Sequence, residues 1–231
     1  MYALQAATSF VTSCALALPL LLVPEKCLSA QVSAGLLGGY SGGAGFQSHA
    51  TVAGFSPRLA AALRFGIERT SLDPGDPEDA RQIFINDATN GTPEKSGRVW
   101  AYRLDVIYPV SAPRRTDHRV DFFGGPRYAR FTGNFRYVGG NEDFEVRGGQ
   151  WGWGAGLDVG FPLTARTELA VVGGIDYFLR STLSGHDTSY SPDGTEVNER
   201  DGHDYEDADD AVNQPGFEPR LLAGVNYHFG K

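Results

Sequence analysis

The stretch WGWGAGLDVGFPL, residues 151–163, alternates between large apolar side chains and almost none. Its odd-numbered positions are all apolar and include Trp151, Trp153 and Phe161, whereas its even-numbered positions up to residue 160 are glycine except for Asp158. Neighbouring side chains of a β-strand point to opposite faces. The pattern therefore predicts a strand with one aromatic face and one nearly bare face that holds a carboxylate.

The same period of two recurs along the chain and predicts eight β-strands in all. The other strands are expected at 99–110, 167–180, 217–229 and 59–68, and with weaker alternation at 119–132, 32–41 and 45–55. After residue 30 we find no segment with a helical period. The mean hydropathy of −0.27 excludes a bundle of transmembrane helices, but it is compatible with strands that are apolar on one face only.

The N-terminal segment predicts a cleaved secretory signal. An apolar core, ALALPLLLV at 15–23, is followed by the small residues Ser29 and Ala30. Residues 1–30 are thus expected to be a signal peptide and residues 31–231 a β-barrel built from the predicted strands, although no Lys or Arg precedes the apolar core. A buried N-terminal helix is the alternative. Both cysteines, Cys14 and Cys27, lie in the expected signal, so the remaining chain would contain no thiol.

The connections between the expected strands alternate in length. Short turns are expected at 56–58, 111–117 and 162–166, and long polar loops at 70–97, 133–149 and 183–215. Short turns at one end and long loops at the other are typical of bacterial outer-membrane barrels. The predicted fold class is therefore all-β, an eight-stranded antiparallel up-and-down transmembrane β-barrel with long extracellular loops.

The two faces of the strands predict which side meets lipid. One face carries aromatic residues near the strand ends, as in the interfacial girdles of membrane barrels; these are Trp100, Tyr108, Trp151, Trp153, Phe161, Tyr177, Tyr227 and Phe229. The other face combines glycine with charges expected to pair in the lumen: Arg64, Glu68, Arg103, Asp105, Asp121, Arg127, Asp158, Glu168, Asp176, Arg180, Glu218 and Arg220. A soluble sandwich or lipocalin-like barrel, with the aromatic face as its core, is the alternative.

The final strand PRLLAGVNYHF (219–229) and the turns YPVSAP (108–113) and FPLTAR (161–166) carry a family resemblance. The chain resembles the small eight-stranded outer-membrane barrels, the group of the opacity proteins and the transmembrane domain of outer membrane protein A. The resemblance implies location in the outer membrane of a Gram-negative cell envelope, with lipid and lipopolysaccharide as partners. It also implies that the barrel-insertion machinery reads the C-terminal strand at Phe229, which Gly230 and Lys231 follow here.

Catalytic groups are sought because some small barrels act on lipid A. Barrels that deacylate lipid A use a His and a Ser two residues apart, but here Ser189 is three residues after His186, in a long polar loop. His228, near the end of the chain, is expected to be a lumen or rim residue. We therefore predict no catalytic residues and no cofactor.

The 183–215 loop is rich in carboxylates. Oxygen ligands suit calcium, and Asp207, Asp209 and Asp210 are the candidate ligands, but no calcium-loop spacing is present and a solvated charge run is the simpler interpretation. A surface ligand of this loop is a further expected partner. The net charge of −8 argues against nucleic acid as a partner.

Three functions follow from these features. The first is a non-enzymatic outer-membrane barrel with a charge-plugged lumen, which serves surface interaction, adhesion or envelope integrity through its loops. The second is a narrow, porin-like pore for small solutes. The third is an outer-membrane lipid-modifying enzyme with His186 or His228 as the base.

Overall fold

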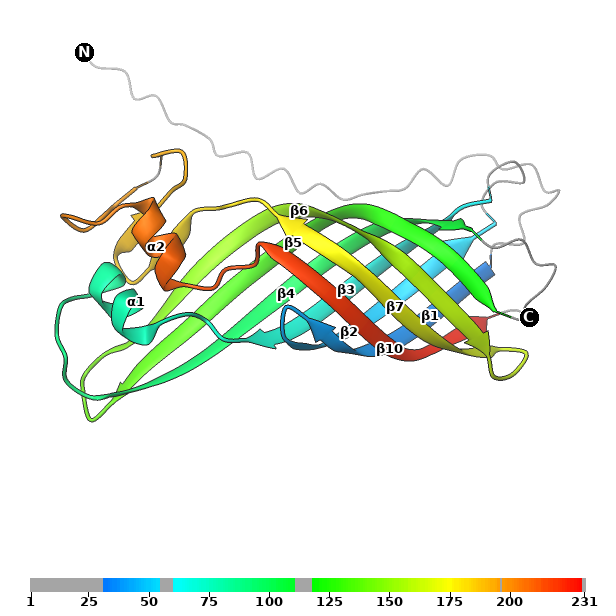
Figure 1. The fold of residues 1–231 in the computed structure, drawn as a ribbon, viewed down its shortest axis with the longest axis horizontal. Helices are drawn as coiled ribbons and strands as arrows, with labels where there is room; N and C mark the ends of the chain where they lie inside the picture. Colours follow the sequence, from blue (N-terminus) through cyan, green and yellow to red (C-terminus); the bar gives the residue numbers. More distant parts are fainter. Residues whose placement is uncertain (1–30, 55–59, 111–117, 196, 230–231) are drawn as a thin grey trace, which may run out of the picture.

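The protein forms a β-barrel with a folded region at one end (Figure 1). The computed structural model describes residues 31–54, 60–110, 118–195 and 197–229. The barrel strands are β1 (Gln31–Ser41), β2 (Ala44–Ala53), β3 (Ala62–Leu72), β4 (Thr92–Pro109), β5 (Arg119–Val138), β6 (Asp143–Pro162), β7 (Thr167–Phe178) and β10 (Phe217–Phe229). The predicted signal peptide and the turns expected at 56–58 and 111–117 lie outside the described residues.

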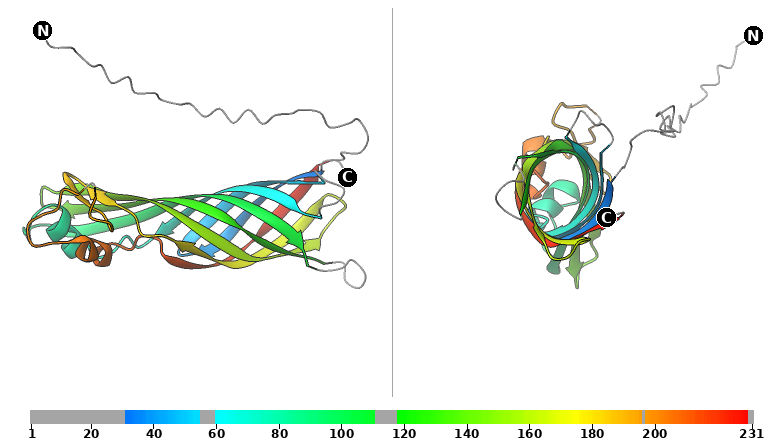
Figure 2. Two further views of the ribbon diagram at one scale, coloured as in Figure 1. Left: turned by 90° about the horizontal axis from the view of Figure 1, so that it is seen from above. Right: turned by 90° about the vertical axis from the view of Figure 1, so that its right-hand side faces the viewer.

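The barrel is closed by pairing of its first and last strands. β10 pairs antiparallel with β1 from Val32↔Phe229 to Ser41↔Arg220, and β5 pairs with both β4 and β6. Every one of these eight strands therefore has two antiparallel neighbours, and the end-on view in Figure 2 shows the resulting ring. The predicted fold class, an eight-stranded antiparallel up-and-down barrel, is confirmed.

Three adjacent strands are much longer than the rest and project beyond the barrel at one end (Figure 1). β4 has 18 residues and β5 and β6 have 20 each, whereas β1, β2 and β3 have 10 or 11. The prediction of a long loop at 133–149 is wrong, because only residues 139–142 separate β5 from β6. The alternation continues through this stretch, but its outward side chains become polar, which resembles a loop composition.

The prediction that no helix follows residue 30 is also wrong. Helix α1 (Pro77–Phe84) begins after Asp76, whose side chain accepts hydrogen bonds from the backbone of Glu78 and Asp79. Helix α2 (Tyr205–Ala211) begins with a capping box at Asp204. Both helices are too short for a helical period to stand out. Within the described ranges, no helix is long and apolar enough to cross a membrane.

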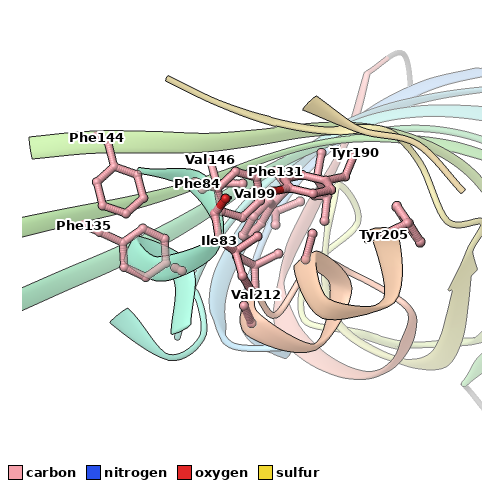
Figure 3. Close-up of a cluster of buried hydrophobic side chains, with 14 of the residues drawn as sticks. Ile83, Phe84, Val99, Phe131, Phe135, Phe144, Val146, Tyr190, Tyr205 and Val212 are labelled. Atoms are coloured by element: carbon pink, nitrogen blue, oxygen red, sulfur yellow. Dashed lines mark hydrogen bonds between the residues drawn. The ribbon is translucent and has the colours of Figure 1, made fainter. Parts of the chain in front are cut away.

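The segments expected as long loops at 70–97 and 183–215 are largely folded. They contain α1, α2 and a hairpin of β8 (Leu183–Gly185) and β9 (Thr188–Tyr190), which pairs with β6. We call the described residues of 73–91 and 179–216 the cap. Its apolar side chains pack on the inner faces of the projecting strands (Figure 3) and share one buried cluster, which includes Phe84, Tyr190, Tyr205, Phe131, Phe135 and Val146. The cap is therefore packed against the strands by a hydrophobic core of its own.

Candidate functional site

The side chains of each barrel strand alternate between a buried inner face and an exposed outer face. On β6, Trp151 and Trp153 are 63% and 66% exposed, whereas Asp158 in the same strand is fully buried. Large apolar residues cover the outside and charged residues occupy the inside, which is the inverse of a soluble barrel. The bare face of residues 151–163 is therefore the lumen face.

One charged cluster fills the lumen at the end nearer the cap. Arg103 donates to Asp176 at 2.7 and 2.9 Å and lies 3.3 Å from Glu68. Arg127 lies 2.7 Å from Asp105 and 3.1 Å from Asp176, and Arg220 donates to Glu68 at 2.6 Å. The cluster holds three arginines and three carboxylates, all buried. We call it the upper cluster; its charges cancel, which offsets the cost of burying them.

A second charged cluster lies nearer the opposite end of the barrel. Arg119 lies 2.7 Å from Glu168 and 3.3 Å from Asp158, and it also pairs with Asp121. Arg64 pairs with Asp158. Asn226 donates to Glu168 at 2.8 Å, and the His228 ring lies 3.5 Å from the same carboxylate. We call this the lower cluster.

An incomplete apolar layer lies between the two clusters, because Arg64 of the lower cluster and Asp105 of the upper cluster face each other in register on β3 and β4. On β5, Phe123 lies between Arg127 and Asp121, and on β10, Leu222 lies between Arg220 and Asn226. The buried residues of this layer are Leu37, Ile107, Phe123, Ala170, Val172 and Leu222. A void bordered by Glu68, Arg103 and Asp176 has a volume of about 20 Å³, which is room for about one water molecule. The lumen is thus filled by charged and apolar side chains.

The structure places ten of the twelve expected lumen charges in these two clusters. Arg180 is a correction: β7 ends at Phe178, and Arg180 is exposed in the cap, where Glu206 and Asp209 pair with it. The charges of Asp209 and Glu206 raise the pKa of Arg180. Glu218 lies half-buried, and its carboxylate accepts a 3.4 Å hydrogen bond from the Gly216 backbone.

Sequence reasoning missed four inward side chains. Arg119 joins three carboxylates, although it stands at the very start of β5. Gln47 accepts a 2.7 Å hydrogen bond from Arg220, and His49 and Asn226 are also buried. The alternation of 45–55 and 217–229 places Gln47, His49 and Asn226 on inner faces, so a search for polar as well as charged side chains would have found them.

The expected girdle residues lie on the outer face at two levels. Tyr177, Tyr108 and Phe229 are 51–56% exposed, and Trp100 and Tyr227 are 38–39% exposed; Phe161 is half-exposed. On β6, Trp151 and Phe161 are ten residues apart, about 33 Å along a strand. At a tilt of about 40° this is a height of about 25 Å, the thickness of the apolar band of membrane barrels.

The other candidate residues lie apart from the lumen, in the cap. The exposed ring of His186 lies 3.1 Å from the Asp187 carboxylate, while Ser189 lies across the β8–β9 hairpin, opposite Ser184. Asp207 belongs to the capping box of α2, and Asp209 pairs with Arg180; Asp210 is exposed. In the part of the chain that the structure describes, no three His, Cys, Asp or Glu side chains converge as metal ligands.

The closed ring, the apolar exterior and the ion-paired lumen together define a small β-barrel of the outer-membrane type. Comparison of folds agrees: a major outer membrane protein from Thermus thermophilus superposes with a TM-score of 0.71 at 22% identity, over 87% of this chain and 100% of that one. The likeness at this identity is one of fold.

Two further solved structures are similar at lower scores. Neisserial surface protein A has a TM-score of 0.39 at 14% identity, over 87% of this chain and 95% of that one. Ail, the attachment invasion locus protein of Yersinia pestis, has a TM-score of 0.42 at 10% identity, over 87% of this chain and 97% of that one. No protein-family model matches the sequence, and neither does any curated protein.

Proposed function

We propose that this protein is a closed, non-enzymatic barrel of the bacterial outer membrane, which presents its cap for surface interaction, adhesion or envelope integrity. The observation that carries this proposal is the lumen, which two clusters of ion pairs and a group of buried apolar side chains fill. Lipid and lipopolysaccharide would surround the aromatic outer face, and the insertion machinery would recognise β10, which ends at Phe229.

The filled lumen favours a closed, plugged barrel rather than a conduit for solutes. An ion crossing the barrel would have to displace side chains of both clusters, and each arginine removed from its carboxylates leaves a buried charge uncompensated, at a cost of about 3–5 kcal/mol. The apolar layer around Phe123 and Leu222 adds a barrier without polar groups to replace an ion's water. The molecule is thus built to stay closed.

The position of the histidines supports a non-enzymatic role. His186 lies on an exposed hairpin turn in the cap, and His228 contacts Glu168 at the lower end of the lumen. A lipid-modifying enzyme would instead need its base beside a nucleophile within hydrogen-bond reach. Replacing His186 or His228 by alanine is expected to leave the chemical structure of lipid A unchanged in cells that express the protein.

Single-channel recording in planar lipid bilayers tests the plug. The wild-type protein is expected to insert without discrete current steps. The test variant replaces Asp105, Arg127 and Phe123 together by alanine, which keeps the net charge of the lumen while emptying part of the upper cluster and of the apolar group. Current steps from this variant alone support a plug made of side chains; regular steps from the wild-type protein would establish a pore.

Cells that lack the protein separate adhesion from envelope integrity. They would be complemented either with the intact chain or with a barrel in which residues 73–91 and 179–216 are replaced by short turns. If the cap mediates adhesion, the shortened barrel should restore resistance to detergents but not attachment to a surface. Full restoration of attachment by the capless barrel would contradict a role of the cap.

A further inference from the structure

Four outward arginines form a compact group just beyond the upper aromatic level of the barrel. Register places them in two adjacent cross-strand rows over β3 to β6. The first row reads Arg69, Trp100, Arg130 and Gly149, and the second reads Ser71, Arg98, Thr132, Arg147 and Ser184. We call Arg69, Arg98, Arg130 and Arg147 the arginine patch.

The positive charge of the arginine patch is largely unbalanced. Glu145 lies 3.7 Å from Arg98 and accepts a 3.0 Å hydrogen bond from Arg147. The guanidinium of Arg69 lies 5.9 Å from the centre of the Trp100 ring, and neither Arg69 nor Arg130 has a carboxylate partner in the described ranges. One carboxylate thus faces four guanidinium groups, in a chain whose net charge is −8.

A neighbouring row shows what a balanced arrangement looks like. Farther from the barrel, Arg136 on β5 lies in register between Glu94 on β4 and Asp143 on β6. The excess of positive charge is therefore specific to the two rows of the patch.

The row on the barrel side of the patch is aromatic. Ile67, Tyr102, Tyr128 and Trp151 follow one another across β3 to β6. The ring centres of Tyr102 and Tyr128 are 6.5 Å apart, and those of Tyr128 and Trp151 are 5.0 Å apart. A shallow groove of about 890 Å³ joins both zones and is lined by Arg69, Arg98, Arg130, Arg147, Tyr128 and Trp100. On β2, Phe46 and Ala44 continue the two rows of the patch without charge, so the feature is one-sided.

We propose that the arginine patch binds the phosphorylated headgroup of a glycolipid in the outer leaflet. This rests on the proposed function, since the patch meets that leaflet only when the barrel spans the outer membrane. Guanidinium groups form charge-assisted, bidentate hydrogen bonds with phosphate. The hydroxyls of Thr132 and Ser184 lie in the same row to bond with sugar, and the acyl chains lie along Tyr102, Tyr128 and Trp151.

The test compares lipid binding by matched variants in phosphatidylcholine vesicles. Wild-type protein, the double variant Arg69→Gln/Arg130→Gln, and the control Arg136→Gln would each be titrated with bisphosphorylated lipid A, followed by tryptophan fluorescence. Each arginine near a membrane surface contributes about fivefold to the binding of an anionic lipid, so the double variant should bind about 25-fold more weakly. The control should match the wild-type protein, because two carboxylates, those of Glu94 and Asp143, flank Arg136 in register.

Two further arms identify the ligand. Dephosphorylated lipid A should bind the wild-type protein and the double variant alike, and inorganic phosphate at millimolar concentration should not compete. Equal affinity of all three proteins for lipid A, or full competition by inorganic phosphate, would overturn the proposal. Each variant is first checked for the mobility shift on heating in SDS. If the wild-type protein does not insert into vesicles at all, this result would instead contradict the proposed function.

Discussion

Gly154 shows how a narrow barrel makes room for buried charges. A Cβ atom at this position would overlap the carboxylate of Asp176 and would lie 2.8 Å from Nε of Arg127. Gly156, two residues on, leaves the same kind of space for the Phe123 ring, which a Cβ atom would approach to 2.7 Å. The glycines of the 151–163 stretch therefore allow the long side chains of neighbouring strands to cross the lumen and meet.

A single methyl group tests this role of glycine. Gly154→Ala should destabilise the protein by about 1–3 kcal/mol, because overpacking would displace the Asp176 and Arg127 pair. Gly173→Ala is the matched control, since a Cβ atom there meets nothing within 4 Å. Urea unfolding of vesicle-inserted protein, followed by tryptophan fluorescence, gives both free energies. Equal stability of the two variants would show that the lumen accommodates a methyl group at residue 154 without displacing its neighbours.

At the scale of elements, the cap is stabilised by few but large side chains. Phe84, at the end of α1, is 1% exposed, and its ring meets that of Tyr190 edge-on at 5.4 Å. The Tyr190 hydroxyl donates to the Ile83 carbonyl at 2.8 Å. These contacts join α1 to the β8–β9 hairpin, although Ile83 and Tyr190 are 107 residues apart along the chain.

Removing the Phe84 ring should loosen the cap and spare the barrel. Phe84→Ala is expected to cost about 3–5 kcal/mol within the cap. Hydrogen exchange should then accelerate in 77–84 and 183–190, while the lumen strands stay protected. Val197→Ala, at a position 43% exposed, is the control. Loss of protection throughout the barrel would show that the cap and the barrel unfold as one unit.

The acidic turn at Asp193 should respond to pH. Hydrogen bonds from Thr195 and Ser191 lower the pKa of the Asp193 carboxyl to about 2. A lowered pKa favours the charged form in the folded turn, so its stabilisation is complete above the ordinary value of 3.8 and is lost as the pH falls through about 2. NMR titration should find this midpoint. Ser191→Ala/Thr195→Val should return it toward 3.8; an unchanged midpoint would refute the role of these donors.

The strands could be predicted because alternation is a local signal, and β10 has the expected bounds of 217–229. The projecting parts of β5 and β6, against which the cap packs, could not be predicted in this way. Phe131, Phe135 and Val146 are inward apolar residues that continue the alternation, but the polar residues between them face water rather than lipid. Likewise, the ion partners of Arg103 and Arg119 depend on the stagger between strands that are distant in sequence, which no pattern within one strand contains.

At the scale of the whole molecule, closure leaves no free strand edge within the ring of eight strands, below the part of β4 to β6 that projects. The ten paired positions between β1 and β10 complete the ring, so SDS finds no exposed backbone hydrogen bonds from which to unravel it. Unboiled protein from an outer-membrane fraction should therefore run faster on an SDS gel than boiled protein. A single mobility, with the protein in the soluble periplasmic fraction, would contradict membrane insertion.

Because β4 to β6 are longer than β1 and β2, the barrel projects to different heights on its two sides. The turn after β5, at residues 139–142, projects much farther along the barrel axis than the turn at Gly42 and Gly43 between β1 and β2 (Figure 1). A neighbour diffusing in the membrane therefore meets a tall polar wall when it approaches β4 to β6, but a low rim when it approaches β1 and β2. Contacts with other surface molecules should consequently depend on whether they approach the barrel from the side of β4 to β6 or from the side of β1 and β2.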